Sequence, residues 1–251
     1  TNLELCMGSR GTASKVVVRG DNEMYFVLPT GWSSKETTNI IRERLKNAGV
    51  DVTAQETKVV ATGYGRVAVD FADKVITEIT CHAKGACYIH KNENMLLIDI
   101  GGQDTKIIRI ENDMVTDFLM NDKCSAGTGR FLEVMANTLS LTPQDLCELA
   151  AKGSGTSISS MCTVFAESEV ISLIGKGTPR EDIAYGVIES VVTKVVQLIS
   201  QVEGDQYFLT GGLCEDPYIL ERLSLALHAP VESVPLARYA GAIGAALTAA
   251  V

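Results

Sequence analysis

Two of the seven cysteines, Cys124 and Cys162, lie in segments that favour thiolate chemistry. Each stands shortly before a predicted helix, which for Cys124 begins at Gly129. A helix N-terminus favours negative charge and lowers a thiol pKa, so it suits a thiolate or an anionic cluster with thiolate ligands. A cubane needs four ligands, and neither cysteine has a second one close by, so two chains would have to share one cluster across a two-fold axis. From the pattern alone, the favoured interpretation is that both cysteines are buried and serve only packing. A zinc site is the third interpretation, after packing and a shared cluster.

Glycine-rich turns at strand ends predict contacts with the phosphates of a nucleotide. Such turns let backbone N–H groups approach phosphate oxygens, although each turn taken alone is more often a plain connection. Asp99 ends a predicted strand, where its carboxylate would hold Mg²⁺ through water, and Asp104 is a second candidate for holding the metal or orienting the attacking water. The predicted nucleotide contacts are Gly8, Ser9, Thr12, Ser14 and Lys15 in a first turn, Gly101, Gly102, Gln103 and Lys106 in a second, Gly127 and Gly129 after Cys124, and Gly211 and Gly212 after a later strand.

Strands and helices alternate along the chain, which predicts an α/β protein. In the first half, residues 15–19 and 24–28 form a predicted hairpin, and a helix with a capping box begins at Ser33. A short strand over 58–61 and a helix around 71–86 follow.

The second half begins with a predicted three-stranded meander over residues 95–100, 106–110 and 114–119. Helices are expected near Gly129, from Thr142 as N-cap, and from Thr178 to about residue 202 with Glu181 completing a capping box. A strand over 206–210 and an Ala-rich helix from about Tyr239 end the chain. The order of hairpin, strand and helix thus occurs twice, which predicts two related domains, 1–93 and 94–251, with the final helix able to pack back on the first.

Composition narrows the classes of partner. The chain has 251 residues, and its formal net charge of -9 argues against a nucleic-acid surface or an anionic-membrane binder, which need concentrated Lys and Arg. No apolar run reaches the roughly 20 residues that span a bilayer, and the start lacks a signal-peptide layout. We therefore expect a cytoplasmic protein in which cysteines serve packing, metal binding or catalysis rather than disulfides.

Six segments, spread over most of the chain from about residue 58, are long or unusual enough to be compared with the motifs of known families. They are TGYGR at 62–66, EITCHA at 78–83, IDIGGQDTK at 98–106, FLMNDKCSAGTGRF at 118–131, SSMCTVFAESEVI at 159–171 and GG at 211–212. Together they resemble the ATP-dependent activators of 2-hydroxyacyl-CoA dehydratases. That family is close to the ATPase subunits of benzoyl-CoA reductase, and both belong to the superfamily of acetate kinase, sugar kinases, actin and the heat-shock chaperone ATPases.

The resemblance implies two actin-like (ribonuclease H-like) domains, with ATP and Mg²⁺ in the cleft between them, and an active homodimer. It implies one 4Fe–4S cluster per dimer, to which each chain contributes Cys124 and Cys162. A ferredoxin or flavodoxin would supply the electron. ATP hydrolysis would then change the setting of the cluster-bearing helices, so that the electron passes at very low potential to a 2-hydroxyacyl-CoA dehydratase or a benzoyl-CoA-type reductase.

The first phosphate turn departs from the family pattern. The family usually has Asp-Ile-Gly-Ser-Thr before its lysine, whereas here Cys6 occupies the Asp place if Arg10 and Gly11 are an insertion, and Gly8 occupies it otherwise. Either alignment leaves that place without a carboxylate. Metal positioning would then rest on Asp99 and Asp104, with altered hydrolysis, or the chain would be a specialised member or a subunit of a hetero-oligomer. Cys6 itself is expected to be a packing residue.

Three other functions are compatible with these residues. The nearest is the ATPase subunit of a benzoyl-CoA-reductase-type complex, which shares the cysteine segments. A small-molecule kinase of the same superfamily would need a substrate pocket and no cluster. A nucleotide-dependent scaffold would follow if the altered first turn abolished hydrolysis.

Overall fold

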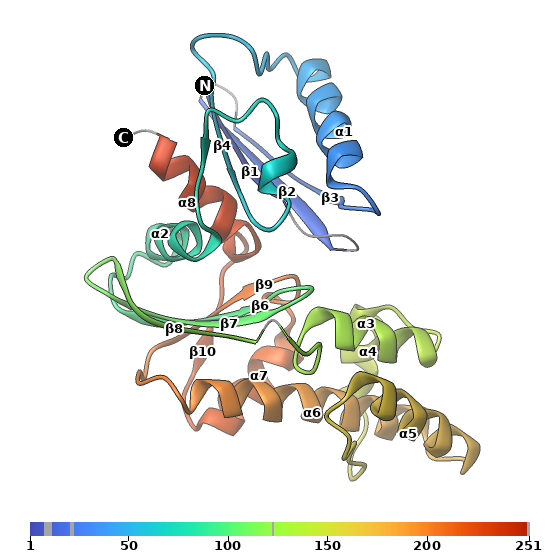
Figure 1. The fold of residues 1–251 in the computed structure, drawn as a ribbon. Helices are drawn as coiled ribbons and strands as arrows, with labels where there is room; N and C mark the ends of the chain where they lie inside the picture. Colours follow the sequence, from blue (N-terminus) through green and yellow to red (C-terminus); the bar gives the residue numbers. More distant parts are fainter. Residues whose placement is uncertain (8–11, 21–22, 122, 250–251) are drawn as a thin grey trace. The chain divides into compact units, whose positions relative to one another are not determined.

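The computed structural model describes residues 1–7, 12–20, 23–121 and 123–249, which form two compact α/β units (Figure 1). Unit 1 consists of Thr1–Glu93, Glu111–Val115 and Leu236–Val251, and unit 2 consists of Asn94–Ile110 and Thr116–Pro235. Each unit is built on one five-stranded sheet. The expected α/β class is confirmed.

The sheet of unit 1 has the order β3-β2-β1-β4-β5. Its strands are β1 (Asn2–Cys6), β2 (Ala13–Arg19), β3 (Met24–Pro29), β4 (Lys58–Thr62) and β5 (Lys74–Val75). The first three pair antiparallel, whereas β4 is parallel to β1 and to β5. Helix α1 (Ser34–Asn47) covers one face of this sheet, while α2 (Glu78–His90) and α8 (Ala240–Ala249) cover the other; a short 3₁₀ turn, η1 (Arg66–Ala68), follows β4 (Figure 1).

The alternation of side chains along β1 explains why both faces need helices. Leu3, Leu5 and Met7 point to the α1 side, where they pack with residues such as Ile41. Cys6 points to the opposite side, where it is buried with the α8 residue Ile243. The expectation that Cys6 is a packing residue is confirmed.

Helices α2 and α8 approach each other so closely that only glycine fits at the crossing. A Cβ on Gly244 would lie 1.6 Å from the carbonyl oxygen of Cys81, and a Cβ on Gly85 would lie 1.8 Å from that of Ala240. Real Cβ atoms essentially never approach backbone this closely, so a larger residue at either position must push the helices apart.

The sheet of unit 2 has the order β10-β9-β6-β7-β8. Its strands are β6 (Met95–Ile100), β7 (Thr105–Glu111), β8 (Met114–Asn121), β9 (Tyr207–Gly211) and β10 (Val231–Glu232). The helices are α3 (Gly129–Thr138), α4 (Pro143–Ala150), α5 (Thr163–Gly175), α6 (Arg180–Ile199) and α7 (Pro217–Leu227). The 3₁₀ turn η2 (Ala237–Tyr239), which follows β10 in the chain, belongs to unit 1. Helices α6 and α7 lie along one face of the sheet, and α3, α4 and α5 gather near one end of it (Figure 1).

The two sheets repeat one arrangement at their centres. In each, the central strand pairs antiparallel with the next strand in the chain and parallel with a later one. The residue near the end of the central strand faces a lysine on the antiparallel neighbour and a threonine on the parallel neighbour. These residues are Cys6, Lys15 and Thr62 in unit 1, and Asp99, Lys106 and Thr210 in unit 2.

Most predicted elements are confirmed to within about two residues, and two predictions were wrong. The helix expected around residues 71–86 begins only at Glu78, because the chain first forms β5 and turns at Thr77. The long helix α6 has Pro179 as its N-cap without a side-chain cap, so Glu181 completes no capping box there. Helix α7 was not predicted. Among the described residues, no helix is long and apolar enough to cross a membrane.

Candidate functional site

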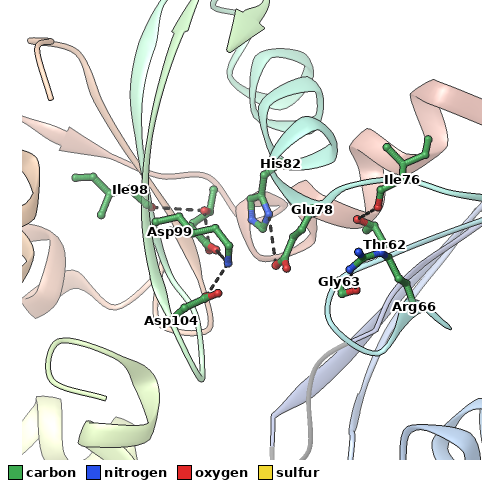
Figure 2. A network of polar contacts seen from close by, with 11 residues as sticks. Thr62, Gly63, Arg66, Ile76, Glu78, His82, Ile98, Asp99 and Asp104 are labelled. Carbon is green, nitrogen blue, oxygen red and sulfur yellow. Dashed lines mark hydrogen bonds and ion pairs between the residues drawn. The ribbon is translucent and has the colours of Figure 1, made fainter. Parts of the chain in front are cut away.

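A buried cluster of charges lies where β6 and β7 meet the turn that connects them. The Lys106 ammonium is 2.6 Å from Asp104 Oδ1 and 3.5 Å from Asp99 Oδ2, and all three residues are at most 3% exposed. Figure 2 shows the Asp99 and Asp104 side chains converging on this point. The Thr210 hydroxyl donates to Asp99 Oδ1 over 3.0 Å. Predicted residues Asp99, Asp104 and Lys106 are therefore brought together, and Thr210 joins them.

The turn before Lys106 is folded tightly around this cluster. The N–H of Gly101 donates to the carbonyl of Asp104 over 2.9 Å. A Cβ on Gly101 would lie 2.9 Å from both that carbonyl oxygen and Asp104 Oδ1, so the turn requires glycine there. Gly102 and Gln103 are exposed at its tip. Backbone N–H groups of such a turn are suited to anionic oxygens.

The start of α3 is fastened to the same turn. The N–H groups of Gly129 and Arg130 donate to the carbonyls of Gly101 and Gly102, each over 2.8 Å. A Cβ on Gly129 would lie 3.2 Å from the Gly101 oxygen. The Thr105 hydroxyl also donates to the carbonyl of Gly127 over 2.6 Å. The residues after Cys124 are thus hydrogen-bonded to the predicted phosphate turn within unit 2.

The glycine pair at the end of β9, Gly211 and Gly212, provides open backbone beside this turn. Gly211 has a φ of 107°, and a Cβ there would lie 2.2 Å from the Ile100 carbonyl oxygen. Gly212 has open space around its Cβ position, with nothing within 4 Å. A flat ligand group could approach the backbone at Gly212, as the sequence predicts for an adenine or ribose.

The first predicted turn is only partly within the described residues. Gly8 and Ser9 lie outside them. Ser14 is buried, with its hydroxyl 2.8 Å from that of Thr30, and Lys15 is half-buried on β2 opposite Cys6. Because Cys6 holds the place that Asp99 holds in unit 2, the alignment with an inserted Arg10 and Gly11 agrees with the strand register.

The segment that follows β4 in unit 1 forms its own compact turn. Gly63 has a φ of 85°, and a Cβ there would lie 2.2 Å from the Met7 carbonyl oxygen, which matches the position of Gly211 in unit 2. The Thr62 hydroxyl donates to the Ile76 carbonyl over 2.9 Å, and Arg66 Nη1 donates to the Gly63 carbonyl over 2.8 Å (Figure 2). Arg66 therefore stabilises the turn itself.

Cys124 and Cys162 are the two exposed cysteines of the chain. Cys162 is the N-cap of α5, so it lies directly before that helix, as expected. The N-cap of α3 is Thr128, so Cys124 lies four residues before the N-cap and not at the end of the helix. The two segments meet, because the hydroxyls of Ser125 and Thr163, the residues that follow the two cysteines, are 2.5 Å apart. The side-chain amide of Asn121 also donates to the carbonyl of Cys124 over 3.0 Å.

These two cysteines could bind an iron–sulfur cluster. The ligands of such a cluster are thiolates, and both sulfur atoms are on exposed segments that one hydroxyl contact holds together. The other five cysteines are buried. Burial raises the pKa of Cys81 to about 11, and burial together with a nearby Asp raises the pKa values of Cys87 and Cys147 to about 12. The two predicted ligands are therefore the thiols that a cluster can reach.

This contrast predicts a selective thiol reaction in the metal-free protein. A thiol with a pKa of 11 or above is a thiolate in on the order of one molecule in a thousand or fewer at pH 8. We expect iodoacetamide at pH 8 to label two cysteines per native chain, identified by peptide mapping as Cys124 and Cys162. Raising the pH toward 11 should label Cys81. Equal labelling of Cys147 and Cys162 at pH 8 would contradict this assignment.

Sequence reasoning missed several residues that fix the site. The side chain of Thr210 is hydrogen-bonded to Asp99, and that of Ser125 to Thr163, although the two residues of each pair are far apart in the chain. Glu169 accepts hydrogen bonds from Ser159 and Ser160. A polar side chain before a glycine turn has no periodic signal of its own, so only the strand register could have identified Thr210.

Comparisons with known proteins agree with this geometry. The profile of the BadF/BadG/BcrA/BcrD ATPase family matches residues 9–249. The (R)-2-hydroxyglutaryl-CoA dehydratase activating ATPase of Acidaminococcus fermentans is 43% identical over 244 residues, which is 95% of this chain and 93% of that relative. A benzoyl-CoA reductase subunit of Thauera aromatica is 31% identical over 212 residues, which is 81% of this chain and 72% of that relative.

The fold comparison gives the same family. The solved structure of the 2-hydroxyisocaproyl-CoA dehydratase activator of Clostridium difficile with bound ADPNP has a TM-score of 0.89 and 35% identity, covering 99% of this chain and 93% of that one. The solved structures with a similar fold, this activator among them, have two domains of the actin-like type, as the resemblance implied. On its sequence and its fold, the chain belongs to the BadF/BadG/BcrA/BcrD ATPase family.

Proposed function

We propose that this chain uses ATP hydrolysis to drive single electrons from a shared 4Fe–4S cluster to a 2-hydroxyacyl-CoA dehydratase. The pairing of two exposed thiols in a member of an ATPase family carries the proposal. Cys124 and Cys162 are on segments joined by the Ser125–Thr163 bond of 2.5 Å. A small-molecule kinase of the superfamily would need no cluster, so it would not require a pair of exposed thiols.

Nucleotide binding is assigned to the glycine-rich turns. The N–H groups of Gly102 and Gln103 would bind phosphate oxygens, and Gly101, whose N–H donates to the Asp104 carbonyl, would let the turn fold tightly enough to present them. Lys106 would stabilise the charge that develops on the transferred phosphoryl group. Asp99 would hold Mg²⁺ through water, and Asp104 would orient the attacking water or assist the metal. Further contacts are proposed for Gly127, Gly129, Gly211 and Gly212, and for Gly8, Ser9, Thr12, Ser14 and Lys15 of the first turn.

A homodimer is supported by the outer face of α5. Val164 and Phe165, directly after Cys162, are each 66% exposed, and the exposed Ile171 and Ile174, seven and ten positions after Val164, lie on the same side of the helix as Val164. Two chains that meet along this face would cover it and bring two Cys162 thiols together. With Cys124 from each chain, the dimer would have the four thiolates that a cubane needs. When bound, the cluster supplies one electron at low potential.

The link between nucleotide and cluster is supported by contacts within unit 2. The phosphate turn bonds the start of α3, and the residues before α3 include Cys124. A change in the turn on hydrolysis would therefore reach the Cys124 segment directly, in addition to any domain movement. The first turn lacks a carboxylate at Cys6, so metal positioning would rest on Asp99 and Asp104.

The partner is inferred from the relatives. Two activators of 2-hydroxyacyl-CoA dehydratases each align with 95% of this chain, whereas the benzoyl-CoA reductase subunit aligns with 81% of it and at lower identity. As such an activator, this chain would work as a separate homodimer, with a ferredoxin or flavodoxin as donor. We propose that it works in the cytoplasm.

A mixing experiment tests this function. The reduced protein is mixed anaerobically with a 2-hydroxyacyl-CoA dehydratase and either MgATP, MgADP or MgADPNP, and the visible absorption is followed. We expect cluster oxidation and dehydratase turnover with MgATP alone. Turnover with MgADP, or no electron transfer with any nucleotide, would contradict the proposal. Purification in a stable complex with other reductase subunits would favour the benzoyl-CoA-reductase type.

A further inference from the structure

The segment that leads into Cys162 is held by one side chain. The carboxylate of Glu169 accepts hydrogen bonds from the N–H of Ser159 at 3.0 Å and of Ser160 at 3.1 Å, and from the Ser159 hydroxyl at 3.1 Å. Two successive N–H groups around one anion form an anion nest, which is here occupied by a residue of the same chain. Glu169 thereby ties the entering backbone to the second turn of α5.

The rest of the segment is fastened elsewhere. Its beginning is fixed on α6, where the N–H of Ser154 donates to Asp182 Oδ1 over 2.8 Å, and Ile158 is buried in the middle. Between Thr156 and Cys162, in the part of the chain that the structure describes, the backbone hydrogen bonds are those to Glu169. Ser159 and Met161 are exposed, so packing alone does not fix this stretch.

The charge of Glu169 suits this task. Burial raises its pKa, but the N–H groups and hydroxyls of Ser159 and Ser160 lower it by more, so its pKa lies below the usual value. The carboxylate is therefore ionised at neutral pH, and its hydrogen bonds are charge-assisted, which makes them stronger than those between neutral groups.

We propose that Glu169 is a positioning residue that sets the backbone geometry of Cys162 through Ser159 and Ser160. This inference rests on the proposed function in so far as Cys162 binds a cluster. Glu169 itself touches neither cysteine in the described contacts. Its effect passes through the residues between the anion nest and the N-cap of α5, and it determines how firmly the Cys162 thiolate is presented.

The test compares Glu169→Gln with Glu167→Gln. Both remove one negative charge from α5, but Glu167 bonds the Thr138 hydroxyl and leaves the segment before Cys162 untouched. A carboxamide has one acceptor oxygen in place of two, so at least one charge-assisted bond is lost. In metal-free protein, we expect hydrogen exchange of the Ser159 and Ser160 amides to speed up about tenfold in Glu169→Gln, without change in α3. Glu167→Gln should exchange at the wild-type rate in this segment.

Reconstituted protein provides the second measurement. We expect iron release to a chelator to be about tenfold faster in Glu169→Gln than in wild type, and the electron paramagnetic resonance signal of the reduced cluster to shift, with both unchanged in Glu167→Gln. Equal amide exchange in wild type and Glu169→Gln would overturn the inference whether or not a cluster forms. Faster exchange with wild-type iron release and signal would overturn it as well. Faster exchange in a protein whose wild type assembles no cluster would instead refute the proposed function and leave Glu169 as the anchor of this segment.

Discussion

Replacing Lys106 with methionine is expected to abolish measurable ATP hydrolysis and to destabilise the protein by about 3–5 kcal/mol. The ammonium lies between two carboxylates, those of Asp99 and Asp104, and none of the three residues is more than 3% exposed. Methionine has a similar length but leaves two buried carboxylates without the positive charge of the lysine. In the proposed function, Lys106 also stabilises the phosphoryl group in the transition state, and such a contact is worth about 100- to 1,000-fold in rate.

A double variant separates the two effects. Lys106→Met with Asp104→Asn removes one carboxylate together with the lysine, so we expect it to recover much of the lost stability but none of the hydrolysis. Arg109→Met is a matched control on the same strand, because Arg109 forms a surface pair with Glu203 whose loss costs between zero and about 1 kcal/mol. Denaturant unfolding and phosphate release measure both quantities. Wild-type hydrolysis in Lys106→Met would exclude this cluster as the catalytic site.

Replacing Gly244 with alanine is expected to cost about 3 kcal/mol of stability, the upper end of what an overpacked core loses. The added Cβ would lie 1.6 Å from the Cys81 carbonyl oxygen and 2.7 Å from the Gly85 nitrogen, so α2 and α8 must separate. Backbone cannot rotate away as a long side chain can.

The control is Gly175→Ala on α5, where nothing lies within 4 Å of the added Cβ. Alanine has the higher helix propensity, so this substitution should be neutral or stabilising by up to about 1 kcal/mol. Thermal unfolding of the two variants gives the comparison directly. A Gly244→Ala protein as stable as the wild type would mean that the two helices do not pack this closely.

The sequence predicted correctly those helices and strands that neighbouring residues mark, through an apolar run or a helix-capping pair. The strand at residues 95–100 begins with four consecutive apolar residues, and α4 has Thr142 and Pro143 at its start, so both were predicted at their observed positions. The helix predicted around 71–86 failed because its apolar residues also suit a short strand, and β5 takes that place by pairing with β4. At Glu181 the chain uses Pro179 as N-cap, and spacing alone could not exclude a capping box.

The candidate site was predictable where it lies on one turn and unpredictable where it joins distant segments. Asp99, Asp104 and Lys106 lie within eight consecutive residues, so the sequence presents them together. Thr210 reaches Asp99 across 111 positions because β9 is parallel to β6, and only the sheet reveals this pairing. The same register places Cys6 opposite Lys15, which shows that unit 1 repeats the arrangement with a thiol in place of the carboxylate.

The shared cluster is the central claim, and metal analysis of anaerobically purified protein tests it most directly. Iron, sulfide and the visible spectrum are measured on wild type, Cys124→Ala and, as a control, Cys214→Ala, which changes a buried cysteine. We predict a brown dimer with about four irons per two chains in wild type and Cys214→Ala, and a colourless protein in Cys124→Ala. A folded wild type that stays colourless after reconstitution with iron and sulfide would contradict the account and favour a kinase or a scaffold.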